Sequence, residues 1–193
     1  MNIVFATNNP HKIRELQALL PSYIKLVSLE EIGCLEDIPE TQDTIKGNAI
    51  QKADYIKQHY GLDCFADDTG LEVAALNNEP GVKSARYAGD HRSDQDNMNL
   101  LLNRLENKGR NARFKTVIAL YINQTYHEFE GIVEGQITLK KTGENGFGYD
   151  PIFEPENCGK TFAEMDINEK NKYSHRARAF SKMLSFLNRE FKK

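Results

Sequence analysis

The segment Asp67-Asp68-Thr69-Gly70 places two adjacent carboxylates, a hydroxyl and a glycine between two short apolar segments. Residues 62–66 are predicted to form a strand that enters the core, and residues 71–73 its continuation or partner. The four residues between them are therefore predicted to form a tight turn at the end of a buried strand, because Asp favours turn starts and Gly accepts positive φ. These residue types either serve only to form the turn or make up a carboxylate site that works with a metal and a phosphate.

A second candidate lies near the start of the chain, where the apolar strand 3–6 is followed by Thr7-Asn8-Asn9 and then by Pro10. Apolar residues recur at helical spacing from residue 13 to residue 20, Asn9 is a good N-cap, and Pro10 suits the first helical position. The backbone N–H groups of this helix start are predicted to be free to hold an anion, with Asn8, Asn9 and Lys12 around them. The alternative is an ordinary capped helix with a solvated lysine.

Two more candidates lie in the second half of the chain. The segment 143–151 is dense in glycine and contains Phe147, Tyr149 and Asp150, so its backbone could approach a ligand closely or could be a flexible connector. Ser174-His175-Arg176 precedes an apolar helical stripe, which leaves His175 and Arg176 on an exposed first turn. Two cations at a helix N-terminus oppose the macrodipole, which favours an anion held there.

The remaining segments position these candidates. A loop from Glu30 to Thr41, which contains Glu40, leads to a helix predicted from about Asp43-Thr44 to Gly61. A capping box at residues 93–96 opens a further helix, and another capping box stands at residues 161–164. Alternating apolar residues over 114–122 and a further run over 126–137 predict a long, mostly buried hairpin.

Composition sets the class of protein. The 193 residues, 39% of them hydrophobic and 27% charged, fit one globular domain over residues 1–193. The apolar runs are too short for a membrane span and the N-terminus lacks a signal peptide pattern, so we expect a cytoplasmic protein with no membrane partner. A formal net charge of -3 argues against a nucleic-acid binder. The three cysteines are widely spaced without a Cys-x-x-Cys pair, which indicates reduced thiols.

Five segments of the chain, taken together, resemble the inosine triphosphate pyrophosphatase family, and the resemblance spans nearly the whole chain. They are Thr7-Asn8-Asn9-Pro10-His11-Lys12, Phe65-Ala66-Asp67-Asp68-Thr69-Gly70-Leu71, Pro80-Gly81-Val82-Lys83-Ser84-Ala85-Arg86-Tyr87, Gly146-Phe147-Gly148-Tyr149-Asp150-Pro151 and Ser174-His175-Arg176. One departure is Thr69, where many relatives carry Ser, but the hydroxyl is kept.

The resemblance implies an α/β fold of the ITPase/Maf-like type, elongated and two-lobed, with a long twisted mixed β-sheet flanked by helices, a central ligand cleft and a homodimer. The implied reaction is Mg²⁺-dependent hydrolysis of XTP, ITP or dITP to the nucleoside monophosphate and pyrophosphate. By the resemblance, Asp68 is the proton acceptor and binds the metal together with Glu40. The implied substrate-binding residues are Thr7, Asn8, Asn9, Pro10, His11, Lys12, Thr69, Phe147, Gly148, Tyr149, Asp150, Lys170, His175 and Arg176.

The chemistry of these residue types agrees with that reaction. A triphosphate is already anionic, so its hydrolysis needs a hard cation, fixed positive donors and a base that orients water. Mg²⁺ prefers one or two carboxylates with phosphate oxygens and water, which suits Glu40 and Asp68, whereas zinc would need clustered His or Cys.

Two other functions remain as alternatives. A Maf-type nucleotide pyrophosphatase has a similar fold, but the segments 147–150 and 174–176 argue against it. A non-catalytic nucleotide-binding module would keep the cleft without turnover, and the intact Asp67-Asp68 pair with Glu40 argues against that.

Overall fold

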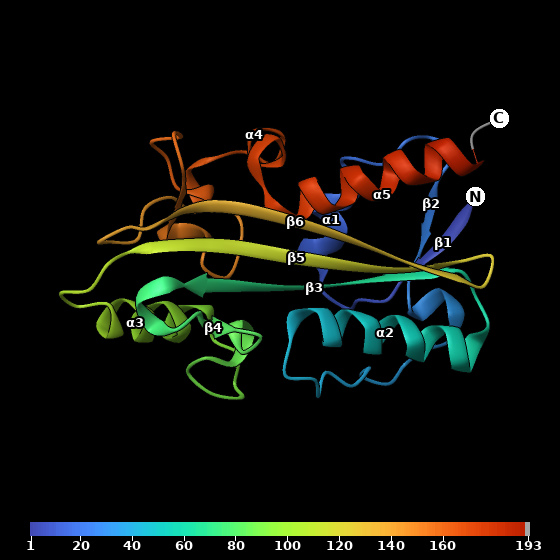
Figure 1. Cartoon of the computed structure of the whole chain (residues 1–193), viewed down its shortest axis with the longest axis horizontal. Coiled ribbons are helices and arrows are strands. Elements are labelled where there is room, and N and C mark those ends of the chain that lie inside the picture. The colour runs from blue at the N-terminus through green and yellow to red at the C-terminus, as the bar shows by residue number, and fades with distance from the viewer. Residues whose placement is uncertain (192–193) are drawn as a thin grey trace. The chain divides into compact units, whose positions relative to one another are not determined.

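A computed structural model describes residues 1–191 of the chain, and Figure 1 shows its helices and strands. The described chain is a mixed α/β structure in which strands and helices are interspersed along the sequence. The strands are β1 (Asn2–Phe5), β2 (Lys25–Val27), β3 (Cys64–Val73), β4 (Glu79–Gly81), β5 (Asn111–Ile122), β6 (Thr125–Ile137) and β7 (Phe153–Pro155), and the helices are α1 (Pro10–Gln17), α2 (Ile45–Tyr60), α3 (Asp94–Arg104), α4 (Ile167–Tyr173) and α5 (His175–Phe191).

The strands form one seven-stranded sheet of mixed direction. The order along it is β2-β1-β3-β5-β6-β7, and β4 pairs with β3 outside this path. The pairs β1–β2 and β1–β3 are parallel, whereas β3–β4 and β6–β7 are antiparallel. The predicted α/β class with a long mixed sheet is therefore confirmed. No helix within residues 1–191 is both long and apolar enough to cross a membrane.

The helix ends follow local sequence signals. The Asn9 side chain caps α1 and Pro10 takes its first position, as predicted. Thr44 caps the start of α2, and Gly61 follows its last residue with φ of 68°, a backbone conformation that glycine adopts without strain. Ser93 caps α3 by accepting a hydrogen bond from the backbone N–H of Asp96.

The predicted turn at residues 67–70 is wrong, because β3 runs without a break from Cys64 to Val73. Asp, Thr and Gly favour turns when only their neighbours in sequence act on them. Here lysine side chains from two helices pair with Asp67 and Asp68, and these contacts stabilise carboxylates inside a strand. The two carboxylates therefore lie in the body of a strand instead of in a loop at its end.

The chain divides into two compact units, and the first comprises residues 1–68, residues 116–131 and the chain from Ala177 onward. Its core contains residues of β1, β3, β5, α1 and α5, among them Phe5, Phe65 and Phe180. The rings of Phe5 and Phe65 stack with 4.5 Å between their centroids.

The second unit comprises residues 69–115 and 132–176. Its core contains residues of β3, α3, β5 and β6 together with the aromatic residues Phe114, Phe153 and Phe162. The rings of Phe114 and Phe153 meet edge to face with their centroids 4.7 Å apart. The single domain with two lobes around one cleft stays a prediction.

Candidate functional site

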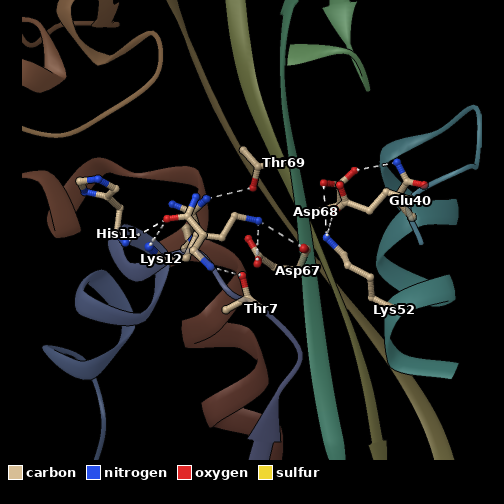
Figure 2. A network of polar contacts seen from close by, with 11 residues as sticks. Thr7, His11, Lys12, Glu40, Lys52, Asp67, Asp68 and Thr69 are labelled. Carbon is tan, nitrogen blue, oxygen red and sulfur yellow. Dashed lines mark hydrogen bonds and ion pairs between the residues drawn. The ribbon is translucent and has the colours of Figure 1, made fainter. Parts of the chain in front are cut away.

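The two adjacent carboxylates of β3 point in opposite directions within the first unit. Successive side chains of a strand alternate between its two sides, so neighbours such as Asp67 and Asp68 cannot face the same partner. Figure 2 shows Lys12 on one side of β3 and Lys52 on the other. The Asp67 Oδ1 atom lies 2.9 Å from Lys12 Nζ, and the Asp68 Oδ1 atom lies 3.7 Å from Lys52 Nζ. Each carboxylate thus has its own lysine.

The segment before and within the first turn of α1 is held by its own side chains. Asn9 Oδ1 accepts hydrogen bonds from the backbone N–H groups of His11 at 2.9 Å and Lys12 at 3.3 Å. Thr7 Oγ1 accepts one from Asn9 N at 3.2 Å. The N–H groups of this helix start are therefore not free as expected, since Asn9 accepts hydrogen bonds from two of them and Pro10 has none, while anion binding by this segment stays a prediction. The positive charge of this segment resides in the Lys12 side chain.

The other predicted residues of this segment lie at the surface. Asn8, Pro10 and His11 are exposed, and Thr7 and Asn9 are half-buried. Their substrate-binding role stays a prediction.

Lys52 is a residue of this site that the motifs did not reveal. Its Nζ atom lies 2.5 Å from Glu40 Oε1 and 3.7 Å from Asp68 Oδ1, and only 7% of its side chain is exposed. Asn48, on the same helix, donates from Nδ2 to Asp68 Oδ2 at 3.5 Å. A signal for Lys52 existed in the sequence, because it occupies the buried face of α2 in helical spacing with Ala49 and Ile56.

Glu40 and Asp68 share one ammonium group, that of Lys52, so this cluster has two carboxylates for one lysine. Burial is the largest influence on the pKa of Asp68 and raises it, with repulsion from Glu40 and Asp67, while attraction by Lys52 and Lys12 only partly opposes the rise. Burial alone would lower the pKa of Lys52, but attraction by Asp68, Glu40 and Asp67 outweighs it and raises that pKa. The Asp68 carboxylate is thus a stronger base than an exposed aspartate.

The donor set suits a hard divalent cation better than zinc. Glu40 and Asp68 offer carboxylate oxygens, and the excess negative charge would be offset by a cation. Within residues 1–191, no group of three or more His, Cys, Asp and Glu side chains could hold a metal ion. Mg²⁺ needs no such cage, because it commonly takes one or two carboxylates and completes its shell with phosphate oxygens and water.

In the second unit, the loop before residue 150 is folded around the carboxylate of Asp150. Asp150 Oδ2 accepts a hydrogen bond from Phe147 N at 2.9 Å and lies 2.6 Å from Lys170 Nζ. Gly146 has φ of 77°, and a Cβ atom there would lie only 2.0 Å from Asp150 Oδ2. Gly148 N donates to Asp94 Oδ2 at 2.7 Å. These contacts fix the loop, and a direct substrate contact by residues 147–150 stays a prediction.

Two cations border the ring of Phe147. Lys170 Nζ lies 5.2 Å and Arg176 Cζ 5.6 Å from the ring centroid, both within cation–π range. An Arg176 guanidinium N–H donates to Thr69 Oγ1 at 3.2 Å. The predicted residues Thr69, Phe147, Lys170 and Arg176 therefore lie together.

The expected exposure of His175 and Arg176 is wrong, because both are buried, with 3% and 2% of their surface exposed. The His175 ring stacks on Phe114 with 4.5 Å between centroids. Helical spacing predicted an apolar stripe after residue 176, but it does not show that the ring of Phe114 covers His175 in the first turn of α5.

Comparison with known proteins identifies the family. The sequence model of the Ham1 family matches residues 3–186. The dITP/XTP pyrophosphatase of Flavobacterium johnsoniae is 59% identical over 97% of this chain and 98% of that protein. The protein of the same name from Flavobacterium psychrophilum is 57% identical over 96% of this chain and 98% of its own length.

A solved structure agrees with these matches. The Staphylococcus aureus Ham1 protein is 40% identical, with a TM-score of 0.90 over 98% of this chain and 100% of that one. The names of the relatives, their sequence identity and the structural similarity together confirm the family predicted from the sequence. The chain belongs to the Ham1 family.

Proposed function

We propose that this protein is a dITP/XTP pyrophosphatase, a hydrolase that converts a deaminated purine nucleoside triphosphate to the nucleoside monophosphate and pyrophosphate. Relatives that carry this name share more than half of their residues with the chain. The structural observation that supports it most is Asp68, a buried carboxylate with a raised pKa beside Lys52 and Glu40.

Asp68 would act as the proton acceptor. Hydrolysis adds water across the anhydride between the α and β phosphates, so one phosphorus–oxygen bond forms, another breaks, and the attacking water loses a proton. A base works best when its pKa approaches the working pH, and burial moves the pKa of Asp68 in that direction. The carboxylate would hold the water and take its proton.

The positive side chains of the same unit would hold the phosphates. Lys52 is buried and Lys12 is half-buried near Asp68 and Asp67, and ammonium groups bind phosphate oxygens as point charges. Glu40 and Asp68 would hold Mg²⁺, which would neutralise charge on the phosphate oxygens. Lys52 also keeps the two carboxylates close by offsetting their repulsion.

Arg176 and Lys170 would read the base. Hypoxanthine and xanthine carry a carbonyl at the purine six position, where adenine carries an amino group. Arg176 and Lys170 offer only donors, so they would pair with the carbonyl and would leave an adenine amino group unpaired. Phe147 would supply a ring on which the base stacks, with His175 and Thr69 supporting the site.

The proposal is tested by product analysis. Purified protein with dITP or XTP and Mg²⁺ should release the monophosphate and pyrophosphate, resolved from orthophosphate by phosphorus NMR. Chelation of the metal should stop the reaction, and added Mg²⁺ should restore it. A nucleoside diphosphate with orthophosphate, or equal rates for dITP and dATP, would contradict the proposal.

A further inference from the structure

The carboxylate of Asp67 is fully buried and forms an ion pair with Lys12. None of its side chain is exposed, and its Oδ1 atom lies 2.9 Å from Lys12 Nζ. Lys12 Nζ also donates to the backbone oxygen of residue 67 at 3.3 Å (Figure 2). An ammonium group carries three donors, so two acceptors from one residue fix its position well.

Both ends of Lys12 are therefore held. Its backbone N–H is bonded to Asn9 Oδ1 at 3.3 Å, and its ammonium group is bonded to Asp67. A lysine side chain is otherwise flexible, and ordering it when a ligand binds lowers the affinity. Lys12 is ordered beforehand by this pair of anchors.

Asp67 has a different position from Asp68. Its side chain lies on the opposite side of β3 from Glu40 and Lys52. A carboxylate would also repel a phosphate that it touched. Its contacts suit the holding of a cation. They do not suit contact with an anionic substrate.

We propose that Asp67 is a positioning residue, which holds the Lys12 ammonium where it meets the phosphate chain of the substrate. The inference rests on the proposed function, because it assumes that Lys12 binds phosphate. In this role Asp67 affects substrate binding through Lys12 and does not itself touch the substrate.

A positioning role and a simple charge effect predict opposite changes in anion affinity when Asp67 is replaced. Replacement of Asp67 by Asn keeps the shape and one oxygen acceptor but removes a negative charge. If Asp67 affected an anion only through its charge, its loss would tighten binding. If Asp67 orders Lys12, its loss should weaken binding by about twofold to tenfold, the cost of ordering one long side chain.

The experiment is a double-mutant cycle with pyrophosphate as the ligand, measured by calorimetry in magnesium-free buffer. We expect Asp67→Asn to weaken pyrophosphate binding in the wild-type background. In a Lys12→Ala background the same replacement should leave binding unchanged or tighten it. Asp63→Asn is the matched control, because Asp63 pairs with Lys57 at 3.6 Å in the same unit, and it should leave binding unchanged.

The outcomes separate the two proposals. Equal weakening in both backgrounds, or tighter binding by Asp67→Asn alone, would overturn the role of Asp67 and leave the proposed function intact. Wild-type protein that neither binds pyrophosphate nor hydrolyses dITP would overturn both.

A second measurement needs no folded Asp67 variant. In wild-type protein with isotope-labelled lysine side chains, the NMR resonance of the Lys12 ammonium should show slowed hydrogen exchange before pyrophosphate is added. Fast exchange like that of an exposed lysine would overturn the inference.

Discussion

Replacement of Asp68 by Asn should lower activity and raise the stability of the metal-free protein at the same time. The amide has nearly the same volume as the carboxylate but cannot accept a proton from water and carries no charge. Asp68 is buried, and its pKa is raised mainly by that burial, so the folded state favours the neutral form that Asn imitates.

The loss of activity follows from the proposed base. General-base catalysis contributes about 10²–10⁴-fold, which corresponds to roughly 3–5 kcal/mol of barrier. We therefore expect kcat for dITP to fall by at least a hundredfold, while binding of dITP falls less. Steady-state release of pyrophosphate and calorimetric titration measure the two quantities.

The gain in stability depends on pH with a definite sign. The unfolded-state pKa of Asp68 is about 3.8 and the folded-state pKa is higher, so the folded protein holds this proton more tightly. Titration of Asp68 therefore lowers the free energy of unfolding of the wild type as the pH rises from about 3.8 through the folded-state pKa. The variant lacks this carboxyl group and so lacks this contribution. The loss is about 1.4 kcal/mol for each unit between the two pKa values, and each kcal/mol changes Tm by about 2–4 °C in a chain of this size.

Thermal unfolding of both proteins in EDTA over a pH series tests this reasoning. The Tm of Asp68→Asn should exceed that of the wild type at neutral pH, and the gap should close near pH 4. The explanation from burial would be refuted by a variant that is less stable at neutral pH. A variant that hydrolyses dITP within about tenfold of the wild type would refute the catalytic role, since that is only about 1.4 kcal/mol of barrier.

Further predictions concern the cations and the assembly. Lys12→Ala should weaken binding of the triphosphate more than of the monophosphate product in calorimetry, because the ammonium meets the phosphate chain, and equal losses would contradict this. Lys52→Met should destabilise the protein by about 3–5 kcal/mol in urea unfolding, because it leaves Glu40 and Asp68 without their shared partner. Arg176→Ala should lower kcat/KM for ITP far more than for ATP, and an equal loss for both would place Arg176 on the phosphates. The resemblance also predicts a homodimer, which sedimentation at micromolar concentration would exclude by showing a monomer.

Local signals were sufficient to predict helices α1, α2 and α3. Asn9-Pro10, Thr44 and Gly61 each act on the backbone within a few residues, so their effect can be read without knowledge of distant segments. The alternation over 114–122 predicted β5 for the same reason. These features need no tertiary partner to be recognised.

The wrong predictions, the turn at residues 67–70 and the exposure of His175, share one physical cause. Lys12 and Lys52 pair with Asp67 and Asp68 and stabilise these carboxylates inside a strand, and the sequence near residue 67 contains no trace of these partners. His175 was expected at the surface because helical periodicity does not show that Phe114 covers it. Polar residues in the interior depend on long-range contacts, so local preferences predict them poorly.

The spacing of the two carboxylates explains how one strand can serve two tasks. Carboxylates two residues apart would lie on the same side of β3 and would repel each other beside one lysine. Adjacent carboxylates lie on opposite sides, so α1 can supply Lys12 to Asp67 while α2 supplies Lys52 to Asp68. A shift of the strand by one residue would exchange the sides and place each carboxylate opposite the wrong helix. The buried apolar residues around the pair, Phe65 and Ala66 before it and Leu71 after it, therefore fix the chemistry as well as the core, because they hold the register of β3.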